Sequence, residues 1–401
     1  MISRGSARST ARHPTRALRG VALLIAVAVL LPTTSASAGN TLRVFGPENE
    51  AGGKMTLVRA RRHARAFRYI VARPLTYAGF VGAMRRTRPN LVLEAYVSGT
   101  FLKVSKADGL PEDWFAHDVN GGRIRSRLWS NYLMDPSSDG WVRNRITTCR
   151  DELGYSHYTG CFVDMLGTEP LTYDYVTSLP IDPATGAVWT RSDWLTATTA
   201  IATRVHQAIA PKPIVVNGIG SGWRYFDPNG KTSRLFSATR VGMAEEFVRA
   251  ARAKLSLHRP VSQWLQDVRM LIDAGARGHH ILAYTKVWLG ATTRQLRRWH
   301  QFALATFMLG NDGDSYFSFS PGPSLVDPHP WWSRRLGDPM GRFFKADGVY
   351  QRRFRYGRVL ANPSGTEHRI WLGGRTYRTL TGDLVRRVTL RPYAGAVLKR
   401  I

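Results

Sequence analysis

The sequence predicts a (β/α)8 barrel of the α/β class, the TIM-barrel architecture, followed by a small C-terminal antiparallel β domain. Short apolar runs alternate with helical stretches of about ten to fifteen residues, which is the pattern of parallel strands and their crossover helices. Eight such runs occur between residues 67 and 320. From residue 357 onward the pattern changes to period-two alternation separated by Gly, Pro and Asn, which is typical of antiparallel strands.

The eight predicted strands are residues 67–72, 91–96, 131–134, 160–165, 214–218, 240–247, 280–286 and 313–320. The expected helices between them include 75–86, 140–153, 192–210, 261–274 and 292–309. Residues 39–66 have weak periodicity and are expected to form an N-terminal arm. The predicted domains are therefore a signal peptide (1–38), this arm (39–66), the barrel (67–345) and the C-terminal β domain (346–401).

The N-terminal residues have the three parts of a secretory signal peptide. Five arginines precede the apolar run 21–31, and Ala36-Ser37-Ala38 supplies a cleavage site before Gly39. The alternative is an uncleaved anchor, although the run is shorter than the roughly 20 residues that cross a bilayer. The sequence thus predicts a secreted protein, extracellular or associated with the cell wall, that does not span a membrane after cleavage.

The chain is strongly basic, with 57 Lys and Arg against 28 Asp and Glu and a formal net charge of +29. This excess is either a generally solvated basic exterior or a surface for an anionic polymer. Outside a cell, that polymer would be an acidic cell-wall polysaccharide. The signal peptide and the lack of a recognisable nucleic-acid-binding module disfavour a nucleic-acid partner.

Cys149 and Cys161 are the only cysteines in the sequence. In an exported protein they predict a disulfide, with two buried thiols as the alternative. Neither a C-x-x-C nor an H-E-x-x-H spacing occurs, so we expect no metal site and no cofactor.

Acidic residues stand at the ends of several predicted strands. Asp135 and Asp164 each end an apolar run, and Glu245 and Glu246 end a third. The carboxyl ends of barrel strands form the face that carries chemistry, and cleaving a glycosidic bond requires two carboxyl groups. Since neighbouring strand residues point to opposite sides, we expect Glu245 to face the barrel mouth, with Glu246 beside it. The alternative for each acid is a structural cap of the following turn.

Further residues near the predicted strand ends could contact a sugar. Sugar sites need flat apolar surfaces together with polar groups for the hydroxyls. Each such residue could instead belong to the core, so their joint placement is the signal. The predicted substrate-binding residues are Tyr96, Trp129, Asp135, Asn217, Glu246, Tyr284 and Lys286, with Trp223 and Trp288 on neighbouring loops.

Five short motifs can be compared with known families: WSNYLMDP (129–136), GCFVDMLG (160–167), VNG (216–218), GMAEEF (242–247) and ANPS (361–364). In these motifs, and from about residue 67 onward, the chain resembles the glycoside-hydrolase-like TIM-barrel proteins of hypothetical glycosyl hydrolase family fifteen. The resemblance implies a barrel with acids on the fourth and sixth strands, with Asp164 at the nucleophile position and Glu245 at the acid/base position. It implies no particular substrate.

Together these features predict an exported glycoside hydrolase that cleaves a poly- or oligosaccharide, with Asp164 and Glu245 as the catalytic carboxyl groups. A retaining mechanism is favoured and an inverting one remains open. As the general acid, Glu245 is expected to have a raised pKa. The alternative is a non-catalytic barrel that binds carbohydrate on a cell-wall or acidic polysaccharide.

Overall fold

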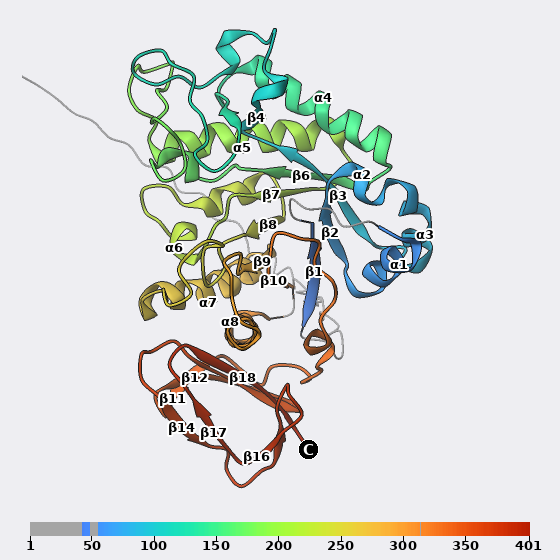
Figure 1. Ribbon diagram of the computed structural model, residues 1–401, viewed down its shortest axis with the longest axis vertical. Helices are drawn as coiled ribbons and strands as arrows, with labels where there is room; N and C mark the ends of the chain where they lie inside the picture. The colour runs from blue at the N-terminus through green and yellow to red at the C-terminus, as the bar shows by residue number, and fades with distance from the viewer. Residues whose placement is uncertain (1–41, 49–54, 313) are drawn as a thin grey trace, which may run out of the picture. The chain divides into compact units, whose positions relative to one another are not determined.

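The computed structural model describes residues 42–48, 55–312 and 314–401, so the predicted signal peptide lies outside the described residues. Eight parallel strands close into a barrel in the order β1-β10-β9-β8-β7-β6-β3-β2 (Figure 1). The predicted fold class is confirmed. The barrel strands are β1 (Arg43–Pro47), β2 (Tyr69–Ala72), β3 (Val92–Ser98), β6 (Gly160–Asp164), β7 (Ile214–Asn217), β8 (Val241–Ala244), β9 (His280–Lys286) and β10 (Tyr316–Ser320).

The first barrel strand lies in the stretch expected to be an N-terminal arm, so that expectation is wrong. β1 pairs in parallel with both β2 and β10 and thereby closes the barrel, and helix α1 (Leu57–Ala66) follows it. Gly46 and Pro47 concealed the strand, because these residue types usually mark turns. A side chain at Gly46 would not fit, since its Cβ would lie 2.6 Å from the Phe67 ring.

The predicted strand 131–134 does not belong to the barrel. Its central part, β5 (Asn131–Leu133), pairs antiparallel with β4 (Phe101–Lys103) in a separate two-stranded sheet. Leu133 packs there in its own apolar cluster with Phe101 and Trp194. A short apolar run does not by itself tell which sheet it joins. Because β1 replaces this segment, Asp164 and Glu245 still belong to the fourth and sixth barrel strands in sequence order.

Helices connect the strands around the outside of the barrel (Figure 1). Three long helices begin with a side chain that accepts a backbone hydrogen bond, at Ser138, Thr190 and Thr292, which satisfies a free N–H of the first turn. After α1, the α-helices are α2 (Pro74–Tyr77), α3 (Val81–Thr87), α4 (Asp139–Ser156), α5 (Arg191–Ile209), α6 (Gly222–Tyr225), α7 (Val261–Ala276) and α8 (Thr293–Gly310).

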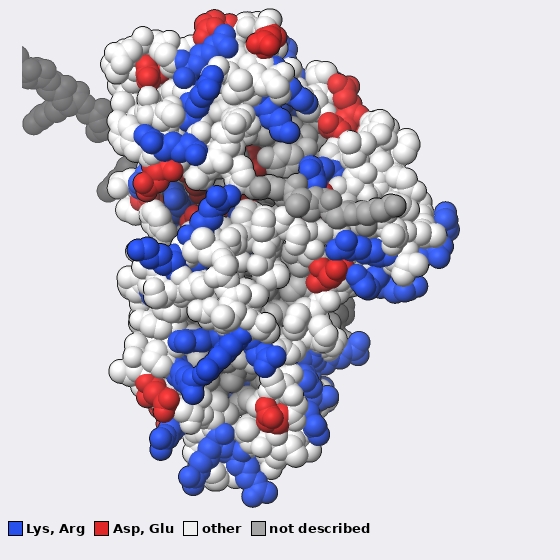
Figure 2. Space-filling view, in the orientation of Figure 1, with Lys and Arg blue, Asp and Glu red and all other residues white. Residues whose placement is uncertain are grey.

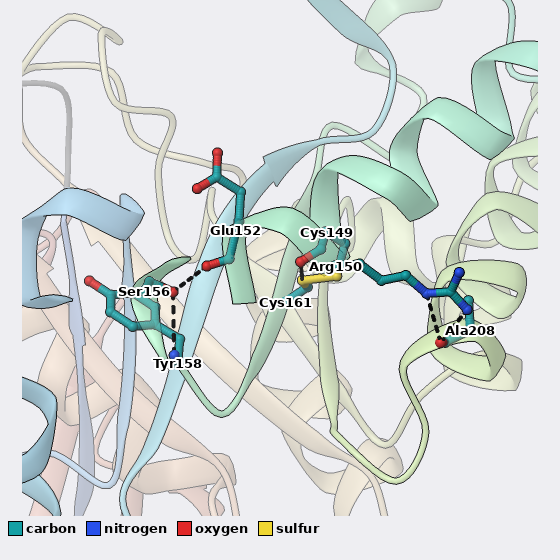
Figure 3. The surroundings of a disulfide bond; sticks show 7 residues. All are labelled: Cys149, Arg150, Glu152, Ser156, Tyr158, Cys161 and Ala208. Carbon is teal, nitrogen blue, oxygen red and sulfur yellow. Dashed lines mark hydrogen bonds between the residues drawn. A yellow bond between two sulfur atoms is a disulfide. The ribbon is translucent and has the colours of Figure 1, made fainter. Parts of the chain in front are cut away.

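A disulfide joins Cys149 on α4 to Cys161 on β6, with the two Cα atoms 6.2 Å apart (Figure 3). Close by, the Arg150 guanidinium donates hydrogen bonds to the Ala208 carbonyl near the end of α5. Helix α4 is therefore fixed covalently to the strand that ends on Asp164 and by hydrogen bonds to the next helix.

The barrel interior is filled by side chains from one face of the strands. They form a compact apolar cluster with members on seven of the eight strands, and Phe45 packs edge-on against Tyr284 at 5.8 Å. Side chains alternate between the two faces of a strand, so a residue two positions after a member of this cluster also points to the inner side of the barrel. The cluster is Phe45, Val71, Phe162, Val215, Val241, Met243, Leu282, Tyr284 and Tyr316, with Tyr69 packed against it.

The C-terminal strands form antiparallel sheets, as expected. β13 and β18 pack against helix α8, and Gly395 allows this close approach, since a Cβ there would lie 2.7 Å from the Ala305 Cβ. The main sheet has the order β11-β12-β13-β18-β15-β16, and β14 pairs with β17. The bounds are β11 (Phe344–Ala346), β12 (Val349–Phe354), β13 (Gly357–Asn362), β14 (His368–Trp371), β15 (Tyr377–Arg378), β16 (Leu384–Val385), β17 (Arg387–Leu390) and β18 (Ala394–Arg400).

Two surface properties bear on the predicted partners. Within the described part of the chain, no helix is both long and apolar enough to cross a membrane. Lys and Arg side chains are spread over the visible face rather than gathered in one patch (Figure 2).

Candidate active site

Five polar side chains come together at the carboxyl ends of the barrel strands. Four of them lie two residues beyond a side chain of the interior cluster, so the alternation of the strand brings them to the inner side of the barrel. Carboxyl ends of barrel strands are where this fold carries its chemistry. The five are Tyr96 on β3, Asp164 at the end of β6, Asn217 at the end of β7, Glu245 directly after β8 and Lys286 at the end of β9.

Asp164 accepts three hydrogen bonds that fix its carboxyl group. The Tyr96 hydroxyl donates to Oδ2 at 2.8 Å, the Asn217 amide donates to Oδ1 at 2.7 Å, and the Met165 backbone N–H donates to Oδ1 at 2.8 Å. Met165 has a φ of 61°, an uncommon left-handed conformation for a side-chain-bearing residue. This turn directs the Met165 N–H back to the carboxyl group that precedes it.

Asn217 connects the two predicted catalytic acids. Its Nδ2 atom also donates to Glu245 Oε2, at 2.8 Å. The nearest oxygens of the two carboxyl groups can therefore be no further apart than the two hydrogen bonds combined, about 5.5 Å. The structure thus brings Asp164 and Glu245 together, with one amide nitrogen between them.

Glu245 has a second partner that sequence reasoning placed only as a substrate contact. The Lys286 ammonium lies 2.5 Å from Glu245 Oε1 and is buried. The same ammonium lies 4.5 Å from the centre of the Trp288 ring and 5.6 Å from that of Tyr284. An ion pair in such surroundings stabilises the ionised carboxylate.

These contacts shift the two acids in opposite directions. Burial, followed by the charge of Glu245, raises the pKa of Asp164 to about 6, against the lowering effect of its hydrogen bonds. Burial would also raise the pKa of Glu245, but the charge and hydrogen bond of Lys286, with the bond from Asn217, outweigh it and lower that pKa. The expectation that Glu245 has a raised pKa is therefore wrong for the free protein, because the positive charge of Lys286 stabilises the ionised carboxylate.

Other predicted site residues lie elsewhere. The Glu246 carboxylate lies 3.9 Å from the Arg259 guanidinium, so Glu245 and not Glu246 joins the pair. Asp135 accepts hydrogen bonds from the backbone N–H (2.8 Å) and hydroxyl (2.7 Å) of Ser137, which makes it a cap of the turn before α4. Asp135 therefore does not end a barrel strand, because the strand assigned to it lies in the separate β4–β5 sheet.

The aromatic residues divide between the barrel interior and its rim. Tyr284 is buried inside the barrel beneath Lys286, which makes it a packing residue. The Trp288 indole N–H donates to the Ser320 hydroxyl at 3.1 Å, beside the ammonium of Lys286. The Trp129 and Trp223 rings each lie near a guanidinium, at 5.4 Å from Arg252 and 4.8 Å from Arg224.

Two neighbours of the pair were not found by sequence reasoning. The Tyr175 hydroxyl donates to the Met165 sulfur at 3.2 Å and thereby supports the turn behind Asp164. Burial raises the pKa of Glu169, whose carboxylate lies 3.7 Å from the Arg224 guanidinium. The signal for Glu169 was its place five residues after Asp164, in the loop that follows a barrel strand.

No group of three or more His, Cys, Asp or Glu side chains in the described ranges is placed to hold a metal ion. The groups that the site offers for chemistry are therefore two carboxyl groups, one ammonium, one amide and one phenol.

Comparisons with known proteins identify a family. The model of the family described as hypothetical glycosyl hydrolase family 15 matches residues 94–358. This range includes all five residues that meet at the strand ends. No curated protein sequence matches the chain.

Several solved structures are similar to the chain at low sequence identity. The glycoside hydrolase domain of PelA from Pseudomonas aeruginosa is 17% identical, with 71% of this chain and 98% of that chain covered and a TM-score of 0.47. The maltogenic α-amylase AmyB from Thermotoga neapolitana is 12% identical, with 90% and 96% covered and a TM-score of 0.48. An α-amylase from Geobacillus thermoleovorans in complex with acarbose is 10% identical, with 90% and 98% covered and a TM-score of 0.48.

Proposed function

Since the chain belongs to hypothetical glycosyl hydrolase family 15, we propose that it hydrolyses glycosidic bonds of a poly- or oligosaccharide with Asp164 and Glu245 as its catalytic pair. Family membership indicates glycan hydrolysis. The observation that carries the assignment of residues is the Asn217 amide, which donates to both carboxyl groups at the mouth of the barrel. Two carboxyl groups from different strands can lie on opposite sides of one bond, as this reaction requires.

We propose a retaining mechanism. Retaining glycosidases hold the two carboxyl groups about 5–5.5 Å apart, whereas inverting ones separate them by about 6.5–9.5 Å to admit a water molecule. The upper limit of about 5.5 Å between the nearest oxygens of Asp164 and Glu245 supports the first arrangement.

In this mechanism Asp164 is the nucleophile and Glu245 the acid/base. Three donors hold the Asp164 carboxyl group in one orientation, which suits an atom that must attack along a fixed line. The acid/base must carry a proton when the leaving group departs, but the Lys286 ion pair keeps Glu245 ionised in the free protein. Substrate binding must therefore separate Lys286 from Glu245, with the ammonium turning to a sugar oxygen, so that Glu245 takes up a proton from solvent water before it donates one to the leaving group.

The test is a hydrolysis screen of the full chain across aryl glycosides and cell-wall polysaccharides. On a substrate found there, Asp164→Asn should abolish turnover while sugar binding persists. Glu245→Gln should spare substrates whose leaving groups need no protonation. Glu367→Gln, which changes an exposed acid next to β14, is the matched control and should retain full activity.

NMR can follow the anomeric configuration of the first product, and the same configuration as in the substrate would support a retaining mechanism. If Asp164→Asn still hydrolysed aryl glycosides and Glu245→Gln did not, Glu245 would be the nucleophile and Asp164 the acid/base. Full activity of Asp164→Asn would disprove the pair. Saturable sugar binding without hydrolysis of any substrate would favour the non-catalytic carbohydrate-binding barrel.

We also propose that the protein is exported and processed before Gly39. The N-terminal sequence supports this, and so does the Cys149–Cys161 disulfide, because disulfides persist in oxidising compartments. Intact-mass measurement of protein secreted by the native host should give a chain that begins at Gly39. A mass that includes residues 1–38 would contradict the proposal.

A further inference from the structure

A cavity of about 980 Å³ lies next to the candidate active site. Its walls come from the loop after β2, helix α2, the end of β3, strand β4 and helix α4. Tyr96 belongs to both places, because it lines this cavity and its hydroxyl donates to Asp164. A sugar unit in the cavity would therefore lie beside the proposed catalytic pair.

Arg145, on the α4 side of the cavity, is a buried cation with only 6% of its surface exposed. Its guanidinium lies 3.8 Å from the centre of the Trp141 ring and donates to the Ser98 carbonyl at 3.2 Å and to the Asn144 side chain. Within the described ranges, no carboxylate lies within ion-pair distance of it. Burying a charge without a counter-charge is costly, so the position of Arg145 suits an anionic ligand.

The other charged groups of the cavity keep it positive. Lys103 and Lys106 are exposed on its wall, and Arg73 is already paired with Glu48 at 2.8 Å. Glu152 is the one carboxylate among the described residues that line it. Lys103, Lys106 and Arg145, none of which forms an ion pair within the described residues, thus share this wall with a single acid.

The cavity also offers the apolar surface that a sugar ring needs. Leu75 and Tyr155 line it with 76% and 61% of their surfaces exposed, and Tyr96 is partly exposed as well. Exposed aromatic rings stack on the C–H faces of sugars, while cations pair with acidic substituents. The combination matches an acidic sugar better than it matches a simple anion.

We propose that this cavity, the Arg145 cavity, is a subsite for a sugar unit that carries an acidic group, either a carboxylate or a sulfate ester. Arg145 and the two lysines pair with the acidic group, and the tyrosine rings contact the sugar ring. The role of this cavity as a subsite rests on the proposed hydrolysis at Asp164 and Glu245, whereas the binding of an acidic sugar does not.

The test measures binding by calorimetry in the full-length Asp164→Asn variant, so that no ligand is consumed. One arm compares oligogalacturonate with its carboxyl-reduced form, and the other compares sulfated carrageenan oligosaccharides with desulfated ones. We expect the acidic member of one arm to bind about tenfold or more tightly than its neutral partner at low salt. The arm that shows this preference identifies the acidic group.

Further substitutions in the same background localise the preference. Arg145→Met should remove it while the neutral oligosaccharide binds as before, and Arg145→Lys should keep part of it. Should Arg145→Met fail to fold, the double variant Lys103→Gln/Lys106→Gln on the exposed wall carries the test. The matched control Lys212→Gln/Lys399→Gln removes two exposed charges elsewhere and should leave the preference intact.

Equal binding of acidic and neutral partners in both arms would overturn the proposal. An equal loss in the control variant would also overturn it, because the preference would then belong to the overall charge. Hydrolysis of a neutral glycan with no acidic preference would refute the Arg145 cavity alone. Acidic preference without any hydrolysis would refute the proposed function alone.

Discussion

Replacing Asp164 by asparagine should make the folded protein more stable at neutral pH. Burial and the charge of Glu245 raise the pKa of Asp164 to about 6 in the folded state. The ordinary value is about 3.9, and each unit corresponds to about 1.4 kcal/mol, so keeping Asp164 ionised costs the folded state on the order of 3 kcal/mol. A neutral amide at this position does not incur that cost.

The pH dependence gives the sign of the effect. Below about pH 4 the carboxyl group is protonated in both states and costs nothing. Between about pH 4 and 6 it ionises in the unfolded chain but stays protonated in the folded one, so the free energy of unfolding falls as pH rises. The amide also loses about 1 kcal/mol, because its NH2 group must face the donating hydroxyl of Tyr96. We therefore expect a net gain of about 2 kcal/mol at pH 7.5 and a net loss of up to about 1 kcal/mol at pH 4.

Urea unfolding at both pH values measures this gain. The matched control is Asp108→Asn, which neutralises an exposed acid and should change the free energy of unfolding by less than about 0.5 kcal/mol. A difference between wild type and Asp164→Asn that is the same at pH 4 and pH 7.5 would refute the reasoning. So would a variant that is less stable than wild type at pH 7.5.

The Lys286–Glu245 ion pair, the disulfide and the net positive charge each allow a further test. Lys286→Met should raise the pKa of Glu245 and move the ionisations in the pH profile of kcat/KM upward, whereas Lys286→Arg should leave them in place; an unchanged profile in Lys286→Met would exclude the ion pair as the cause. The double variant Cys149→Ser/Cys161→Ser opens a loop with a sequence separation of 12 and should lose about 3 kcal/mol of the free energy of unfolding in urea; wild type measured after reduction should show the same loss. Retention on an acidic polysaccharide column should fall steeply between about 0.1 and about 1 M salt, because the Debye length shrinks from about 10 to about 3 Å. Retention that does not change with salt would point to recognition in the Arg145 cavity instead.

Residues at strand ends could be predicted from the sequence because the period of a strand is local. Asp164 and Asn217 each end a clear apolar run, so alternation alone placed them at the barrel mouth. The same logic missed β1, whose Gly46 and Pro47 mimic a turn, since the need for a glycine comes from Phe67 on another segment.

The charge state of the site could not be read from the sequence. It depends on Lys286, which lies 41 residues from Glu245 in the chain and reaches it only because their strands are neighbours in the barrel. The Arg145 cavity was hidden for a similar reason. An arginine within a helix is usually solvated, and only the packing of α4 against the end of β3 buries this one.

The strand β1 pairs with β2 and with β10, which the ribosome synthesises much later than β1. Its Arg43 aligns with Tyr316 of β10, about 270 residues later, while its other edge pairs with β2. Contacts between such distant segments form slowly, because the intervening chain must be ordered first. The barrel thus closes where β1, its first strand in the sequence, pairs with β10, its last. Removing residues 42–48 would leave two open strand edges, which invite pairing with another molecule, so loss of this short segment should appear as aggregation.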